Sequence, residues 1–167
     1  MYRNLLLLTV LAAVSPLLVG CESNSLSGPL WWLEYEAEAT VSANTVHYTL
    51  TIRNPSAETL RFMAGGCTRG AALSVHDPES SGSVRWDQVR WVHEVVPPGE
   101  VFCPADLIPV TIPAGEEITV QGGTQAWVIL GDSLPEGPYS FRVRAWFYDD
   151  DGATGPAIPA GEGVLRR

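Results

Sequence analysis

Three consecutive carboxylates, Asp149-Asp150-Asp151, stand before Gly152 and form the sharpest charge cluster in the sequence. Carboxylate oxygens in such a group could ligate Ca²⁺. The run lacks the alternating Asp-x-Asp-x-Asp-Gly spacing of a calcium loop and its distant Glu. A solvated turn between two strands is therefore the better interpretation, and we expect no metal site here.

The three histidines, His47, His76 and His93, are well separated along the chain. Their flanks, such as Val46-His47-Tyr48, are typical of strand surfaces, so a shared metal ion is not expected. The sequence contains no Gly-x-Ser-x-Gly elbow, no phosphate-binding Walker loop and no His-Glu-x-x-His motif. These observations favour a protein that is not an enzyme and that uses no cofactor.

The N-terminal residues have the pattern of an export signal. A short, positively charged start at Met1-Tyr2-Arg3-Asn4 precedes an apolar run from Leu5 to Val19. This run has the length of a signal peptide and is shorter than a membrane-spanning helix.

The run ends in Leu18-Val19-Gly20-Cys21, which resembles the lipobox of bacterial lipoproteins. The resemblance implies cleavage before Cys21 and acyl chains on its thiol and the new N-terminus. Each buried methylene contributes about 0.8 kcal/mol, so more than one chain makes a stable anchor.

We therefore divide the chain into a leader (residues 1–20), a lipidated cysteine with a flexible polar tether (21–30) and one domain (31–167). In lipoproteins of enteric-type bacteria, Asp after the cysteine favours the inner membrane. Glu22 thus indicates the outer membrane, with the domain facing the periplasm or the exterior. The expected location is the bacterial cell envelope, with the N-terminal lipid in the membrane.

Two cysteines, Cys67 and Cys103, remain after lipidation of Cys21. Export implies an oxidising compartment, where an even pair predicts a disulfide. Closing about 37 residues contributes roughly 4 kcal/mol in the chain-entropy model. A buried free pair and a metal site are the alternatives, and the absence of a Cys-x-x-Cys motif argues against metal.

The composition favours a folded, acidic domain. The hydrophobic fraction is 46%, the charged fraction is 17%, and the net charge is −9. An acidic domain repels phosphate groups, so nucleic acid is not an expected partner.

Period-two alternation dominates residues 31–167 and predicts short antiparallel strands. Leu33, Tyr35, Ala37, Ala39 and Val41 alternate with an acidic face of Glu34, Glu36 and Glu38. Similar alternation or apolar runs predict further strands at residues 46–52, 60–62, 73–75, 84–86, 89–96, 118–120, 127–129, 139–147 and 161–167.

Many short strands separated by Pro and Gly indicate an all-β, immunoglobulin-like β-sandwich. Trp86, Trp127 and Phe141 are expected to fill its core. The pair Trp31-Trp32 is expected to pack under the sandwich.

Several motifs occur in an order that resembles the BsuPI-type intracellular proteinase inhibitor domain, over about residues 41–147. They include Asn54-Pro55-Ser56, Leu73-Ser74-Val75-His76-Asp77, Ile112-Pro113-Ala114-Gly115-Glu116 and Leu134-Pro135-Glu136-Gly137-Pro138-Tyr139. The resemblance implies an immunoglobulin-like sandwich and, as an alternative function, proteinase inhibition. The lipobox and the expected disulfide depart from that family, and no reactive-site motif can be carried over.

The first hypothesis is thus a lipid-anchored, non-enzymatic module that binds another envelope component. A proteinase inhibitor is the alternative, and an enzyme of unknown activity comes third. We expect recognition through loops, with Arg69 as the candidate binding residue, because an Arg in a rigid loop can bind a carboxylate through two hydrogen bonds.

Replacing Cys21 with Ala should abolish lipid attachment, because no other residue of the motif can accept a diacylglycerol. Metabolic labelling with a radioactive fatty acid and detergent-phase partitioning measure this directly. Equal partitioning of Cys21→Ala and wild type into the detergent phase would refute the anchor.

Overall fold

The structure is a computed structural model that describes residues 29–65, 68–78, 83–95, 107–148 and 155–167. Its strands form two antiparallel sheets that pack face to face, together with a small third sheet. The first sheet has the order β1 (Glu34–Ser42), β2 (Thr45–Arg53) and β7 (Glu117–Gln125). The second has the order β10 (Ala157–Leu165), β8 (Gly137–Ala145), β4 (Ala71–His76) and β5 (Val84–Asp87).

These orders are those of an immunoglobulin-like sandwich. β1, β2 and β7 take the places of strands A, B and E, and β10, β8, β4 and β5 those of G, F, C and C′. The predicted fold class is therefore confirmed.

The hairpin between β1 and β2 turns at Ala43 and Asn44, whose φ angles are 46° and 59°. Positive φ at both central residues is the geometry of a type I′ turn, whose twist matches that of the flanking strands.

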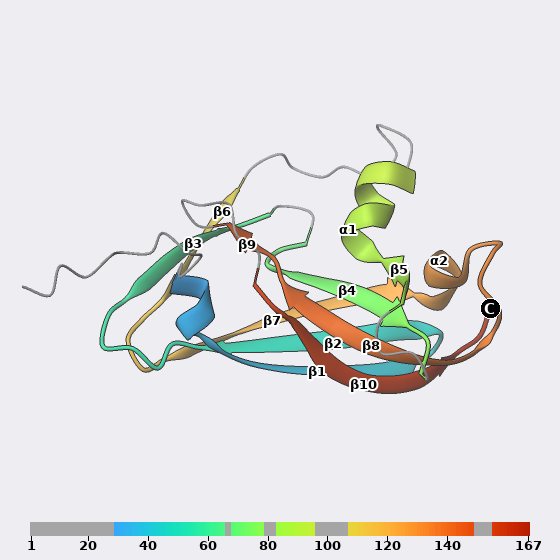
Figure 1. The fold of residues 1–167 in the computed structure, drawn as a ribbon, viewed down its shortest axis with the longest axis horizontal. Coiled ribbons are helices and arrows are strands. Elements are labelled where there is room, and N and C mark those ends of the chain that lie inside the picture. Colours follow the sequence, from blue (N-terminus) through green and yellow to red (C-terminus); the bar gives the residue numbers. More distant parts are fainter. Residues whose placement is uncertain (1–28, 66–67, 79–82, 96–106, 149–154) are drawn as a thin grey trace, which may run out of the picture.

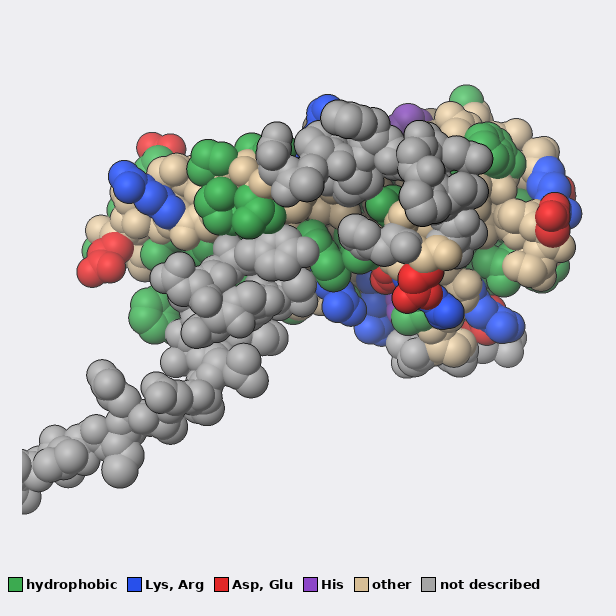
Figure 2. All heavy atoms as spheres, turned by 90° about the horizontal axis from the view of Figure 1, so that it is seen from above, with side chains coloured by type: hydrophobic (Ala, Val, Ile, Leu, Met, Phe, Trp, Pro, Cys, Tyr) green, Lys and Arg blue, Asp and Glu red, His purple; other side chains and the backbone are tan. Residues whose placement is uncertain are grey.

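The third sheet lies at one end of the sandwich (Figure 1) and has the order β6 (Ile108–Ile112), β3 (Leu60–Ala64) and β9 (Phe147–Tyr148). β3 follows β2 in the chain, β6 precedes β7, and β9 follows β8. This sheet thus continues strands of both main sheets. Hydrophobic side chains gather over this end of the molecule in Figure 2, and Leu107 and Ile108 are exposed there.

The core lies between the two main sheets and is made by every second residue of the long strands. On β2 the even-numbered positions are buried and Arg53, His47 and the threonines face outward or are half-buried. On β8 the alternation places Tyr139, Phe141, Val143 and Ala145 inside. Trp86 and Phe141 are buried, as expected.

Residues 89–96 were expected to form a strand, and for 89–95 this prediction is wrong. The chain instead forms a short helix, α1 (Gln88–Arg90), continued by a π-helical turn, η2 (Trp91–Val95). Asp87 starts the helix, because its Oδ1 accepts hydrogen bonds from the N–H groups of Val89 and Arg90, both at 3.0 Å. Arg90 and Glu94 add an ion pair one turn apart, at 2.7 Å.

The strand expected around Trp127 and Ile129 is also wrong. Residues Ala126–Leu130 form the helix α2, which buries Ala126, Ile129 and Leu130 and leaves Trp127 64% exposed. Burial at positions i, i+3 and i+4 is helical spacing, but a single turn is too short to reveal it in the sequence. Trp127 is therefore not a core residue.

The pair Trp31-Trp32 was expected to pack under the sandwich, and for Trp32 this prediction is wrong. It lies in a 3₁₀ turn, η1 (Pro29–Trp32), and is 61% exposed. The neighbouring Leu30 is fully buried and occupies the core position at this point. Tyr35 fixes the turn, because its hydroxyl donates a 2.6 Å hydrogen bond to the Leu30 carbonyl.

Tyr139 fixes the connection into β8. Its hydroxyl donates a 2.7 Å hydrogen bond to the carbonyl of Pro135, four residues earlier. A tyrosine at the start of strand F that bonds back to the preceding corner is the tyrosine corner of immunoglobulin-like sandwiches. Burial also raises the pKa of Tyr139, so the hydroxyl stays protonated as the donor.

Replacing Tyr139 with Phe should lower the free energy of unfolding by about 1 kcal/mol, because one partly buried hydrogen bond is lost and the ring packing is kept. Urea unfolding of the full chain measures the difference. Tyr35→Phe, which removes the bond from the Tyr35 hydroxyl to the Leu30 carbonyl, should lower stability by a similar amount and compares the corner with another Tyr hydrogen bond. Unchanged stability of Tyr139→Phe would show that the corner contributes nothing.

Candidate functional site

Arg69 lies in a turn, Thr68-Arg69-Gly70, that leads into β4. Its φ is 49°, a left-handed conformation that L side chains rarely adopt. The side chain is exposed and forms no ion pair with any residue that the structure describes. The turn thus holds a guanidinium in solvent on a strained backbone.

Backbone hydrogen bonds hold this turn in place. The N–H groups of Thr68 and Arg69 both donate to the Gly65 carbonyl, at 3.3 and 2.9 Å, and that of Ala71 donates to Thr68, at 3.0 Å. The Gly70 carbonyl accepts a 2.9 Å bond from the N–H of Trp146.

Gly70 makes the turn compatible with the core. Its φ is 96°, and a Cβ at this position would lie 2.7 Å from Cε1 of Phe147. Only glycine meets both conditions. The close packing of Gly70 on a buried ring therefore fixes where Arg69 emerges.

Several predicted site residues lie outside the described residues. These are the lipidation site Cys21, the expected disulfide partners Cys67 and Cys103, and the Asp149-Asp150-Asp151 run. The anchor, the disulfide and the turn remain predictions.

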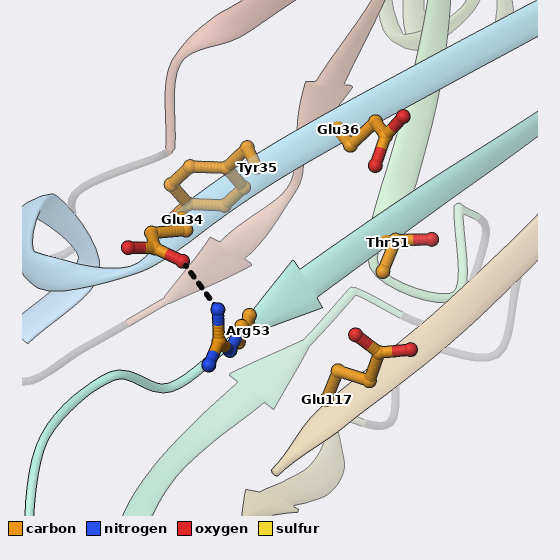
Figure 3. Close-up of a pocket in the computed structure, with 6 residues that line it drawn as sticks. All are labelled: Glu34, Tyr35, Glu36, Thr51, Arg53 and Glu117. Carbon is orange, nitrogen blue, oxygen red and sulfur yellow. Dashed lines mark hydrogen bonds and ion pairs between the residues drawn. The ribbon is translucent and has the colours of Figure 1, made fainter. Parts of the chain in front are cut away.

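A second candidate surface is the outer face of the sheet β1-β2-β7, where the acidic alternation of β1 lies. Glu34, Glu36 and Glu38 are all exposed, as expected. At one end this face has a shallow depression of about 440 Å³ (Figure 3). It is lined by Glu34, Tyr35, Glu36, Thr51, Arg53 and Glu117.

The strand register explains why these residues meet. Arg53 on the central strand pairs with Glu34 on one side and Glu117 on the other. Figure 3 shows Glu36 and Glu117 on either side of Thr51. Three carboxylates and one guanidinium give the depression a net negative charge.

Arg53 offsets part of that charge through an ion pair with Glu34, at 3.4 Å. Both side chains are more than half exposed, so solvent screens the pair and it contributes little stability. Sequence reasoning missed Arg53, Thr51 and Glu117 as members of this surface. Alternation placed Arg53 and the threonines on an outer face, but only the β2–β7 register brings Glu117 beside them.

His47 and His76 lie on separate strands, β2 and β4, and the side chain of His93 lies outside those that the structure describes. The described residues contain no group of three or more His, Cys, Asp or Glu side chains that could hold a metal ion. His47 is exposed on β2, as expected, whereas His76 on β4 is only 5% exposed. The expectation of a surface histidine is wrong for His76, because β4 is central in its sheet and buried on both faces.

His76 contacts a serine hydroxyl. Its Nε2 lies 3.0 Å from Oγ of Ser74, two residues earlier on the same face of β4. Asp87, the cross-strand neighbour of Ser74, caps α1. Among the described residues no carboxylate bonds to the imidazole to complete a Ser-His-Asp arrangement.

No helix among the described residues is long and apolar enough to cross a membrane.

Lowering the pH should destabilise the domain through His76. Burial lowers the pKa of His76, and the Arg142 charge lowers it further, while Asp87 and the Ser83 backbone act in the opposite sense. A lowered folded-state pKa means that the stability from the neutral ring is complete above about pH 6.5 and is lost as the pH falls through the folded-state pKa. Urea unfolding between pH 7 and pH 5 measures this loss.

His76→Gln keeps a polar group near Ser74 but does not titrate, so its stability should fall less over this range than that of wild type. His47→Gln, on the exposed face of β2, is the control and should follow wild type. Identical pH dependence of wild type and His76→Gln would contradict the role of His76.

No protein-family model and no curated protein matches the chain. Among solved structures it is similar to β-glucosidase 3B from Thermotoga neapolitana in complex with glucose, with a TM-score of 0.38, 13% identity, and coverage of 81% of this chain and 17% of that one. It is also similar to a β-glucosidase from Kluyveromyces marxianus, with a TM-score of 0.39, 10% identity, and coverage of 80% of this chain and 15% of that one. A protein from Archaeoglobus fulgidus has a TM-score of 0.37 and 10% identity, with coverage of 81% of this chain and 98% of that one. The chain spans only a small part of either glucosidase, and a likeness at this level carries no conclusion about activity.

Proposed function

We propose that this protein is a lipid-anchored, non-enzymatic component of a bacterial cell envelope whose immunoglobulin-like sandwich binds another envelope component. The observation that carries the proposal is the left-handed backbone of Arg69, with an exposed guanidinium on a turn that is hydrogen-bonded to the rest of the fold. The membrane contact is assigned to the lipid expected on Cys21.

The backbone conformation at Arg69 has a free-energy cost that glycine at this position would not have. A non-glycine residue in the left-handed region is destabilised by about 1 kcal/mol or more. At Ala43 and Asn44 the two-residue hairpin requires this conformation. At Arg69, glycine would adopt the same φ angle without strain. We therefore attribute the presence of arginine here to a role of its side chain.

The fixed turn suits Arg69 to recognition. A partner that meets a pre-ordered loop loses less conformational entropy on binding than one that must order the loop. A guanidinium can donate two parallel hydrogen bonds to a carboxylate, which adds geometric specificity. An acidic group on the partner is therefore the expected ligand of Arg69.

Replacing Arg69 with Gly separates stability from binding. The variant should raise the free energy of unfolding by about 1 kcal/mol, because glycine adopts positive φ without strain. It should also weaken partner binding about tenfold or more, which corresponds to about 1.4 kcal/mol or more. Urea unfolding measures the first effect.

Site-specific photo-crosslinking of the lipidated full chain in its native envelope measures the second effect, with an aromatic photoreactive residue at the half-buried position 146, whose N–H bonds to the Gly70 carbonyl. Wild type should give a discrete crosslinked species that Arg69→Gly reduces. Arg61→Gly, which removes an exposed Arg from β3, is the control and should leave this species unchanged. A crosslinked species of equal yield in wild type and Arg69→Gly would refute the role of Arg69.

A further inference from the structure

β7 is an edge strand whose outer side pairs with no described strand. The sheet order β1-β2-β7 puts it last, and its partner is β2. Each of its nine residues is exposed or half-exposed, so no described segment covers this strand closely. An edge with unpaired backbone groups is a template for adding another strand.

The register identifies the backbone groups that are unpaired. In a two-residue hairpin the residues that flank the turn, Ser42 and Thr45, form a hydrogen-bonded pair. Odd-numbered residues of β2 therefore bond to β1 and even-numbered ones to β7. The bond from the Asn54 N–H to the Glu116 carbonyl, at 2.9 Å, fits this alternation.

The same alternation continues across β7. Its even-numbered residues pair with β2, and the N–H and C=O groups of the odd-numbered residues point away from the sheet. These outward-directed residues are Glu117, Thr119, Gln121, Gly123 and Gln125.

The edge is also not protected against pairing. Protected edges carry Pro, charged side chains or a bulge. Over residues 117–125, β7 has no Pro, its one charged residue is Glu117 at its start, and its register with β2 is unbroken.

The core-facing side of β7 is incompletely covered. Leu50 and Ile52 on β2 are fully buried, but their partners in register, Val120 and Ile118, are only half-buried. An added strand with apolar side chains opposite these two would cover them. The edge therefore favours a bound strand that has apolar residues at alternate positions.

The outward-facing side selects the opposite kind of side chain. Glu117 starts β7 on the outer face, beside a depression that also contains Glu34 and Glu36. A strand added to β7 places its other alternate residues on this face. Basic side chains there are attracted by the net negative charge, and a second copy of this acidic chain is not.

We infer that the β7 edge binds an extended peptide segment with alternating apolar and basic side chains, as an added strand of the sheet β1-β2-β7. This interaction surface is separate from the Arg69 turn, so it stands or fails independently of the function proposed above.

The test uses a fluorescent peptide of nine residues, the length of β7, with alternating valine and lysine, and the full chain in detergent. Fluorescence anisotropy measures binding. Two comparison peptides keep the protein unchanged: one with N-methylated alternate amides, which cannot extend the ladder, and one with glutamate in place of lysine. Both should bind at least about tenfold more weakly than the valine–lysine peptide.

Thr119→Pro tests the same edge from the protein side. Proline at an outward-directed position blocks docking without removing a bond to β2. It should abolish peptide binding, whereas Thr119→Ala, which removes the side chain alone, and Arg69→Gly should bind like wild type. Glu117→Gln should weaken binding several-fold and reduce its dependence on salt.

Equal binding of the N-methylated and unmodified peptides would overturn the inference even if Thr119→Pro failed to fold. Equal binding of the glutamate and lysine peptides would overturn the charge assignment. Self-association of wild type that Thr119→Pro abolishes, measured by analytical ultracentrifugation, would assign the edge to a second copy and equally overturn the inference.

Discussion

The Tyr48 hydroxyl joins elements of both main sheets to the start of α1. It is buried on β2, and its hydroxyl donates to Oε1 of Gln88, at 2.9 Å, and lies 3.4 Å from the Ala71 carbonyl on β4. Gln88 Oε1 also accepts a 3.0 Å bond from the Leu73 N–H. Because β5 ends at Asp87, the Gln88 side chain supplies the acceptor that a longer β5 would have given. One phenol thus links the two sheets and the start of α1.

Most of the fold could be predicted because it follows period-two alternation. β1 and β2 match the alternating segments that the sequence contains, and the last segment does return as β10 beside β8. The failures occur where short helical segments replace a strand, at residues 88–95 and Ala126–Leu130, and at β6, a strand that the alternation did not predict. One turn gives at most two helical repeats of burial, and valine and isoleucine in these segments have high strand propensity. The deciding contacts, such as the Gln88 amide with Leu73, are long-range.

The candidate surfaces could be predicted only in part. Glycine on both sides of the segment identified Arg69 as a loop residue, but not its left-handed backbone, which depends on how Gly70 meets Phe147. The acidic face of β1 followed from alternation alone. That Glu117 joins it depends on the pairing of β7 with β2, two strands that are more than sixty residues apart in the chain. Register at that separation leaves no local pattern.

The position of Tyr48 also limits what β7 can contribute to the core. A Cβ at Gly122 would lie against the Tyr48 ring and hydroxyl, so β7 cannot place a side chain there. The Tyr48 ring takes the space that a core side chain of β7 would fill. The inner side of β7 therefore carries the side chains of only Ile118, Val120 and Thr124. Substitutions that strengthened β7 packing at position 122 would displace Tyr48 from Gln88. The ring that links the two sheets therefore also keeps position 122 of the edge strand without a side chain.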